Sequence, residues 1–272
     1  MPTYRERLFA GASHACAALV VAAPLSIVLV LLWSALQPSG QSPETLGGTL
    51  QIVGRLLSAT AVAGMVGAIV GGGIGVACAV AAEELATGAI RVVLLAAIAA
   101  LAVTPAIVFG WAAAAFVVPL ERSLIPQSGQ WFVASATVLA AMAVPTSCAL
   151  ATRALRRVPN RQREAAVAAG ADKVRTVGDV VVPAIRGRIV AALVAAFARA
   201  IGEATALQVL FVWLRPPSGD GMPLVAPWML SLSANAAWGS LHVEAAAALA
   251  LLLVVAAAAL YVDREFGGLQ WA

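Results

Sequence analysis

Six long apolar segments constrain this chain more than any other feature. They cover residues 15–36, 58–82, 92–118, 132–151, 189–214 and 243–262. A helix rises about 1.5 Å per residue and the hydrocarbon layer of a bilayer is roughly 30 Å thick, so about 20 apolar residues are enough to cross it. The whole chain agrees, because 62% of its 272 residues are hydrophobic, 11% are charged and its mean hydropathy is +0.94. The sequence predicts an all-α integral membrane protein of six transmembrane helices, folded as one domain over residues 1–272.

The basic residues predict an orientation in the membrane. Thirteen of the 17 Lys and Arg fall before the first segment, after the sixth, or between the second and third or the fourth and fifth; Arg55, Arg122 and Arg215 fall on the other side. Positive segments stay on the cytoplasmic side, so both termini are expected there. The net charge of +4 therefore reflects orientation and does not indicate nucleic-acid binding. The first segment resembles a signal peptide, but its length favours an uncleaved span.

Small residues and prolines shape the predicted spans. Within 58–82, Gly67, Gly71 and Gly75 recur at every fourth position, the spacing that lets helix backbones approach closely. Pro105 and Pro145 lie within the third and fourth spans and are expected to kink them. The two histidines and three cysteines are scattered and predict no metal site.

The segment 152–188 is too polar to span a membrane and reads as two short helices. Asn160 is the expected cap of the first, Gly170 the left-handed residue that ends it, and Asp172 the cap of the second. The second helix is expected to run to about Val182, with Pro183 marking the break before the fifth span. Such a unit suits docking to another protein, but composition alone equally allows an arginine-rich loop that only follows the positive-inside rule.

Spacing within this segment favours docking. Glu164-Ala165-Ala166, then Gly170, then Val180-Val181-Val182-Pro183 resembles the EAA loop of permeases of ABC importers. The resemblance implies the type I ABC-importer permease fold, with 152–188 as a cytoplasmic coupling loop. It also implies that Glu164, Ala165, Ala166, Gly170 and Pro183 couple the chain to a separate ATPase dimer. This chain has no Gly-x4-Gly-Lys-Ser/Thr loop, so no cofactor is expected in it, and ATP and Mg would be bound by the partner ATPase.

Two charged residues fall deep inside the fifth apolar segment. Arg199 is expected near the bilayer centre, with Glu203 one helical turn further on the same face. A central arginine costs about 2.5–3.5 kcal/mol on insertion scales, so such residues usually face a partner or an aqueous path. One hypothesis is an ion pair that only holds helices together. The other is that Arg199 binds a passing oxyanion, while Glu203 accepts a hydrogen bond from a protonated one and repels sulfate.

Further resemblance favours the second hypothesis. The run Ala198-Arg199-Ala200-Ile201-Gly202-Glu203 looks like a segment of the phosphate-specific transport permeases, and residues 104–111 and 239–243 resemble two others, closer to the PstC type than to PstA. What this implies is a permease of a phosphate importer in the bacterial inner membrane, with Arg199 and Glu203 linked to translocation. The implied partners are a second homologous permease and an external phosphate-binding protein. His242 lies in a matching stretch and is expected to be an interfacial residue.

Two rival hypotheses remain at this stage. The first keeps the importer and changes the cargo to sulfate, molybdate or tungstate. The second is an ATP-independent channel or an intramembrane enzyme. No Gly-x-Ser-x-Gly motif supports an enzyme, and a channel would not need the EAA spacing, so a transporter subunit without enzymatic activity is expected. Whether the partner permease is identical, and whether 216–241 forms an outer gate, stay open.

Overall fold

The chain is described here by a computed structural model that covers residues 43–124, 127–203, 205–214, 253–262 and 264–265. Every regular element in these ranges is a helix, and none is a strand. The predicted all-α class is therefore confirmed for this part of the chain. The first span at 15–36, His242 and the segment 216–241 lie outside the described residues, as does the first half of the sixth span, 243–252.

The second span is the longest element. Helix α2 runs over Pro43–Val80 and continues into a wide π-helical turn, η1, over Ala81–Leu85. The predicted span 58–82 lies within it, but the helix begins 15 residues earlier, at Pro43. Residues 44–57 contain glycines but no proline, so no strong helix breaker ends the helix there. Hydropathy therefore marks only the apolar part of a longer helix.

The third span is broken, and the prediction of a single kinked helix over 92–118 is wrong. Helix α3 covers Gly88–Val103, and the chain resumes as α4 (Ala106–Ala112), η2 (Ala113–Val117) and α5 (Val118–Leu124). Thr104 is extended, with φ −61° and ψ 124°, and so is Pro105, with φ −59° and ψ 143°. The ring of a proline disfavours helical geometry in the residue before it, which accounts for the break at Thr104.

The fourth span is a single helix, as predicted, and extends further at both ends. Helix α6 covers Gln127–Leu155 and contains Pro145. The hydroxyl of Ser147 donates to the carbonyl oxygens of Ala143 and Val144 at 3.0 and 3.1 Å. Packing on both sides holds α6 helical in spite of its proline.

The coupling segment forms the predicted two-helix unit with two differences. Helix α7 covers Asn160–Ala168, and a second helical stretch is made of α8 (Lys173–Arg175), η3 (Thr176–Val181) and α9 (Val182–Ala184). Asn160 is the first helical residue, so the predicted cap is wrong and Pro159 takes that place, which suits a proline's extended backbone. Pro183 is also not the break: it lies in the first turn of α9, where its missing N–H costs little, and the chain turns by 71° at Ile185.

The fifth span begins at this turn. Helix α10 covers Arg186–Ile201 and is followed, after a break at Gly202 and Glu203, by α11 over Thr205–Leu214. The prediction of one continuous helix over 189–214 is therefore wrong. A last described helix, Leu253–Val262, is the second half of the predicted sixth span.

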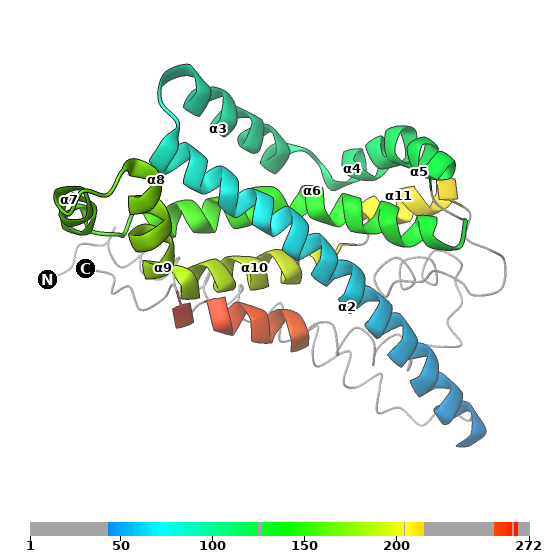
Figure 1. Cartoon of the computed structure of the whole chain (residues 1–272). Helices are drawn as coiled ribbons and strands as arrows, with labels where there is room; N and C mark the ends of the chain where they lie inside the picture. Colours follow the sequence, from blue (N-terminus) through cyan, green and yellow to red (C-terminus); the bar gives the residue numbers. More distant parts are fainter. Residues whose placement is uncertain (1–42, 125–126, 204, 215–252, 263, 266–272) are drawn as a thin grey trace, which may run out of the picture.

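Helix α2 packs between α6 and α10, which it crosses in Figure 1. A methyl group added at Gly71 would overlap the backbone carbonyl of Ala140, and one at Gly75 would overlap the carbonyl of Val144, both on α6. On another side of α2, a methyl group at Gly72 would come within 2.7 Å of Leu193 on α10. The predicted close approach through the glycines of this span is confirmed.

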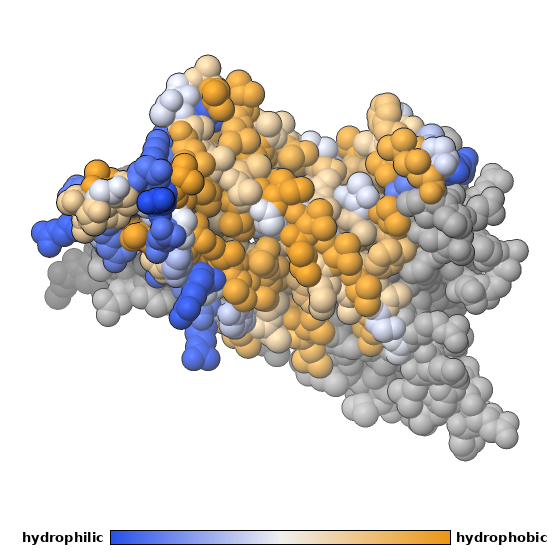
Figure 2. Space-filling model, in the orientation of Figure 1, coloured by the Kyte–Doolittle hydropathy of each residue, from blue (hydrophilic) through white to orange (hydrophobic). Residues whose placement is uncertain are grey.

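The outer surface of this bundle is apolar, as lipid requires. Large hydrophobic side chains are exposed along α2 and α3, and Figure 2 shows an apolar band between a polar end at α7 and α8 and a smaller polar patch at the opposite end. By length and composition, Leu57–Leu85, Ala106–Leu124 and Phe132–Leu155 can each cross a membrane, and the bent pair Lys173–Ala184 and Arg186–Ile201 makes a fourth candidate.

Candidate functional site

The break in the fifth span is built around Glu203. Gly202 leaves α10 with φ −82° and ψ −2°, which turns the chain before α11 begins. One carboxylate oxygen of Glu203 accepts hydrogen bonds from the Thr205 hydroxyl at 2.7 Å and from the Ala206 backbone N–H at 3.0 Å. The first N–H groups of a helix have no partner within it, so Glu203 satisfies an orphan donor at the start of α11.

The second oxygen of Glu203 pairs with Arg199, as the spacing predicted, although the two no longer share a continuous helix. The distance from Nη1 of Arg199 to Oε2 of Glu203 is 3.2 Å. The side chain of Glu203 is only 6% exposed, whereas that of Arg199 is 48% exposed. The carboxylate is thus enclosed and fully engaged, and the guanidinium keeps donors available on its open side.

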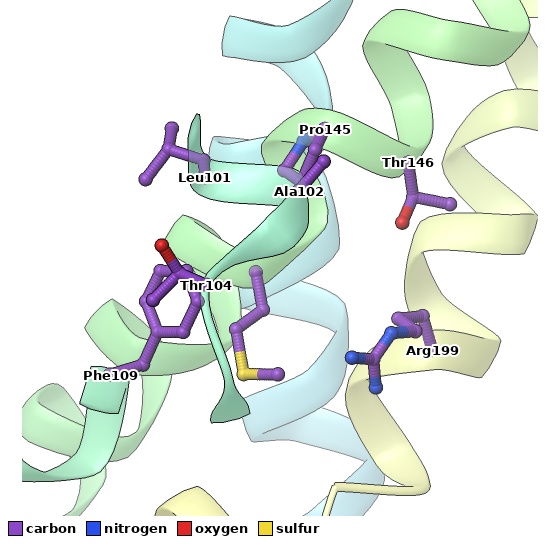
Figure 3. A pocket seen from close by; sticks show the side chains of 8 residues that line it. Leu101, Ala102, Thr104, Phe109, Pro145, Thr146 and Arg199 are labelled. Atoms are coloured by element: carbon purple, nitrogen blue, oxygen red, sulfur yellow. The ribbon is translucent and has the colours of Figure 1, made fainter. Parts of the chain in front are cut away.

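That open side faces a pocket of about 190 Å³. Its polar members are Arg199, Thr104 and Thr146, and its apolar walls come from α3, α4 and α6. In Figure 3 the Arg199 guanidinium and the Thr146 hydroxyl both point into this space, the first from α10 and the second from α6. The break of the third span borders this pocket through Thr104, and Pro145 of the unbroken helix α6 also lines it.

The two threonines offer different chemistry to a ligand. The Thr104 hydroxyl donates to the carbonyl oxygen of Ala100 at 2.7 Å, so its proton is already used within α3. The Thr146 hydroxyl has no hydrogen-bond partner among the described residues and can donate. Sequence reasoning did not select either threonine; the resemblance at 104–111 was the only signal near the first, and nothing singled out the second.

Four of the five residues predicted to couple the chain to an ATPase lie in or just after α7, at one end of the molecule. Glu164 and Ala165 are exposed on α7, Ala166 is half-buried, and α7 projects from the bundle in Figure 1. Gly170 has φ 89°, the left-handed conformation predicted for the end of this helix. Asp172 accepts a hydrogen bond from the Arg175 N–H at 2.7 Å, so its predicted role as a cap is confirmed. Pro183 lies apart from these residues, exposed in α9 at the foot of α10.

Three arginines near this end pair with two glutamates that sequence reasoning missed. Glu83 accepts hydrogen bonds from Arg156 at 2.7 Å and from Arg91 at 3.3 Å. Glu84 accepts from Arg163 at 2.6 Å. Both glutamates belong to η1 at the end of α2, and their partners on the coupling segment are more than 70 residues away in sequence. No local pattern signals such a contact.

Comparison with known proteins decides the family. Residues 71–267 match the family described as "binding-protein-dependent transport system inner membrane component". The chain belongs to this family. Its members are permease components of ABC importers, so the type I importer permease fold and the membrane-embedded transport role expected from the sequence are confirmed.

Two relatives of this permease are informative. It is 28% identical over 188 residues to the probable ABC transporter permease protein YqgH of Bacillus subtilis (strain 168), an alignment that covers 69% of this chain and spans 58% of that relative's length. Its fold is similar to a chain of the MetNI methionine ABC transporter in inward-facing conformations, with a TM-score of 0.53 and 19% identity over 82% of this chain and 97% of that one. The second likeness concerns the fold alone.

Proposed function

We propose that this chain is a permease subunit of an ATP-driven importer of inorganic phosphate. It forms half of the translocation pathway, beside a second homologous permease, in a bacterial inner membrane with both termini in the cytoplasm. A dimer of ATPase subunits binds ATP and Mg, and an external phosphate-binding protein delivers the cargo. The permease family supports the machine, and the chemistry of the pocket supports an oxyanion as cargo.

One observation carries the choice of an oxyanion. Arg199 lines a pocket inside an apolar bundle with its guanidinium half exposed, although its carboxylate partner is enclosed. A guanidinium has five N–H donors in a planar fork that matches the oxygens of phosphate, and only one of them is used by Glu203. Arg199 and the Thr146 hydroxyl then donate to the oxyanion from two sides of the pocket.

Glu203 has two tasks in this proposal. It holds Arg199 and the start of α11 in place through three hydrogen bonds. When substrate draws Arg199 away, the freed oxygen of Glu203 accepts a hydrogen bond from the O–H of hydrogen phosphate, and its charge repels an anion with no proton to offer. Selection against sulfate therefore depends on opening the Arg199–Glu203 pair.

Coupling to ATP uses the exposed face of α7. Glu164, Ala165 and Ala166 enter a groove of the ATPase, the turn at Gly170 sets the angle of α7 against the second helical stretch, and Pro183 lies where that stretch meets α10. An alanine-rich helix is slim enough to enter such a groove. Closure of the ATPase then moves α10. Arg199 lies in this helix about 13 residues, or roughly 20 Å, after its first residue.

The test is uptake by the reconstituted importer. The chain is co-purified with its ATPase and partner permease, placed in liposomes with the binding protein, and assayed for phosphate-stimulated ATP hydrolysis and phosphate uptake. We expect both, with sulfate competing weakly. Stimulation of ATP hydrolysis by another oxyanion and not by phosphate would refute the assignment of the cargo. It would leave the assignment as an ABC importer intact.

One observation favours a second candidate, an importer of sulfate, molybdate or tungstate. Glu203 already accepts three hydrogen bonds and its side chain is 6% exposed, so in this conformation it has little room to accept a hydrogen bond from the cargo. Competition between oxyanions at one pH separates the two candidates directly.

A further inference from the structure

Arg163, the residue just before the coupling glutamate, makes more polar contacts than any other arginine in the described part of the chain. Its guanidinium donates to both carboxylate oxygens of Glu84, at 2.6 and 3.3 Å. It also donates to the backbone carbonyls of Val158 at 2.6 Å and of Leu155 at 3.1 Å. Asn160 provides a fifth acceptor at 3.4 Å. A guanidinium has five N–H donors, so this side chain is close to saturated.

These contacts join three elements. Arg163 itself lies in the first turn of α7, Glu84 lies in η1 at the end of α2, and Leu155 is the last residue of α6. The last carbonyls of a helix have no partner within it, and that of Leu155 accepts from both the Val158 N–H and Arg163. The side chains of Arg163 and Glu84 are 24% and 11% exposed, which shields their ion pair from solvent better than the 62% exposure of Arg156 allows its own.

We propose that Arg163 is a positioning residue that fastens the ATPase-docking helix α7 to α2 and α6, so that a movement of α7 reaches the substrate pocket along these helices as well as through α10. The inference rests on the proposed function, because it assumes that α7 docks an ATPase. The short segment 156–159 already joins α7 to α6, and Arg163 adds a connection to α2 that the chain path lacks. Towards α10, α7 is linked in sequence only through a turn, a second helical stretch and a 71° bend.

The route from Arg163 to the pocket is made of close contacts. Gly72 and Gly64 of α2 touch α10, the second of them against Ile201, two residues from Arg199. Helix α6 carries Pro145 and Thr146, which line the pocket. The glycine contacts leave no space for α2 to shift without displacing its neighbours, so the bundle transmits a push at η1 as a rigid body. Without Arg163, α7 loses this tie to α2 and is joined to α6 by the segment 156–159, so less of its movement reaches the two helices.

The experiment measures how much cargo enters per ATP hydrolysed by the full importer in liposomes. The variants are Arg163→Glu, Glu84→Arg, the double exchange, and the milder Glu84→Gln. Arg153→Glu is the matched control, because it makes the same charge change on an exposed arginine of α6 with no ion pair among the described residues. Cargo is whichever oxyanion the wild-type importer takes up, so a wrong assignment of phosphate leaves this test intact.

We expect each charge reversal to lower the ratio of uptake to hydrolysis about tenfold and Glu84→Gln about threefold, with ATP hydrolysis within about twofold of wild type. The double exchange should recover at least half of the lost ratio, since it restores the ion pair but not the carbonyl contacts. Arg153→Glu should keep the wild-type ratio. A ratio unchanged in Glu84→Gln and in both reversals would overturn the proposal. So would a loss of ATPase binding in both reversals that the double exchange does not repair. A wild-type chain that binds no ATPase would instead refute the proposed function.

Discussion

Two Arg–Glu ion pairs in this permease are made of the same residue types but differ in which partner has its hydrogen-bonding groups occupied. At the end of the molecule that carries α7, Arg163 donates to both oxygens of Glu84 and to further acceptors, so the arginine is the saturated partner. At the break of the fifth span, Glu203 accepts three hydrogen bonds and Arg199 donates one, so the carboxylate is the saturated partner. The first pair is closed, whereas the second leaves donors facing a pocket.

The difference teaches how to separate a structural pair from a binding one. A saturated arginine has nothing left to give a ligand, and its removal leaves several acceptors unpaired. An arginine with spare donors in an apolar bundle is costly unless water or a ligand satisfies them. Counting the used donors of each guanidinium therefore supports our proposals that Arg163 serves coupling and that Arg199 binds substrate.

The strongest test of this assignment is Arg199→Ala. Truncating one partner of an enclosed charge pair costs roughly 2–5 kcal/mol, so phosphate uptake should fall by about 30-fold or more. Arg199→Lys should recover only part of the loss, because an ammonium lacks the planar fork. Uptake is measured in liposomes at equal amounts of assembled importer. Wild-type uptake by Arg199→Lys would show that the spare donors bind no oxyanion.

A second test disturbs helix α2. This helix leads into the turn that carries Glu84 and packs against α10, the helix of Arg199. A methyl group at Gly71 would overlap the carbonyl of Ala140, while one at Gly73 meets nothing within 4 Å. We expect Gly71→Ala to destabilise the folded protein by about 1–3 kcal/mol through overpacking. Gly73→Ala, which gains the same helix propensity, should be neutral or stabilising. Thermal unfolding in detergent compares the two, and equal midpoints would contradict the close contact.

These packing contacts were predictable from the sequence, because they depend on local spacing. The same holds for the coupling segment, where Gly170 and Asp172 adopt the conformations expected of a helix end and a helix cap. Such signals act within one or two turns of backbone. They fix an element regardless of what packs against it.

The helix breaks were not predictable in this way. Pro105 and Pro145 lie in similar apolar runs, yet the first separates two helices and the second stays inside α6. The outcome depends on packing, since α6 packs against both α2 and α10, whereas α3 lies on the outside of the bundle with no buried residue. The apolar segment of the fifth span also continues across Gly202, so hydropathy does not indicate the helix break there. The pairing of Glu84 with Arg163 crosses 79 residues, a separation at which a single sequence carries no information about contact.

Glu203→Gln sharpens the comparison at its saturated carboxylate. The amide keeps an acceptor for Ala206, but it presents an N–H to Arg199 and carries no charge. If the charge repels an unprotonated oxyanion, its loss should strengthen sulfate competition about tenfold, which corresponds to about 1.4 kcal/mol. Sulfate inhibition of phosphate uptake gives the number. Unchanged inhibition would leave Glu203 with its positioning task and favour the second cargo candidate.

The smallest expected effect distinguishes the pocket at Arg199 from the Arg163–Glu84 pair by which kinetic quantity changes. Thr146→Val removes one hydroxyl from the pocket while keeping its shape, and a single hydrogen bond contributes about 1 kcal/mol, so the KM for uptake should rise roughly fivefold. Thr137→Val is the control, because that hydroxyl bonds the carbonyl of Val133 on an exposed side of α6. Cargo transported per ATP should stay constant in both variants, since neither touches the contacts of Arg163. A pocket variant should change KM while the cargo transported per ATP stays constant. Glu84→Gln should change the cargo transported per ATP while KM stays constant. A variant at either site that changed both quantities would contradict the distinction between the two pairs.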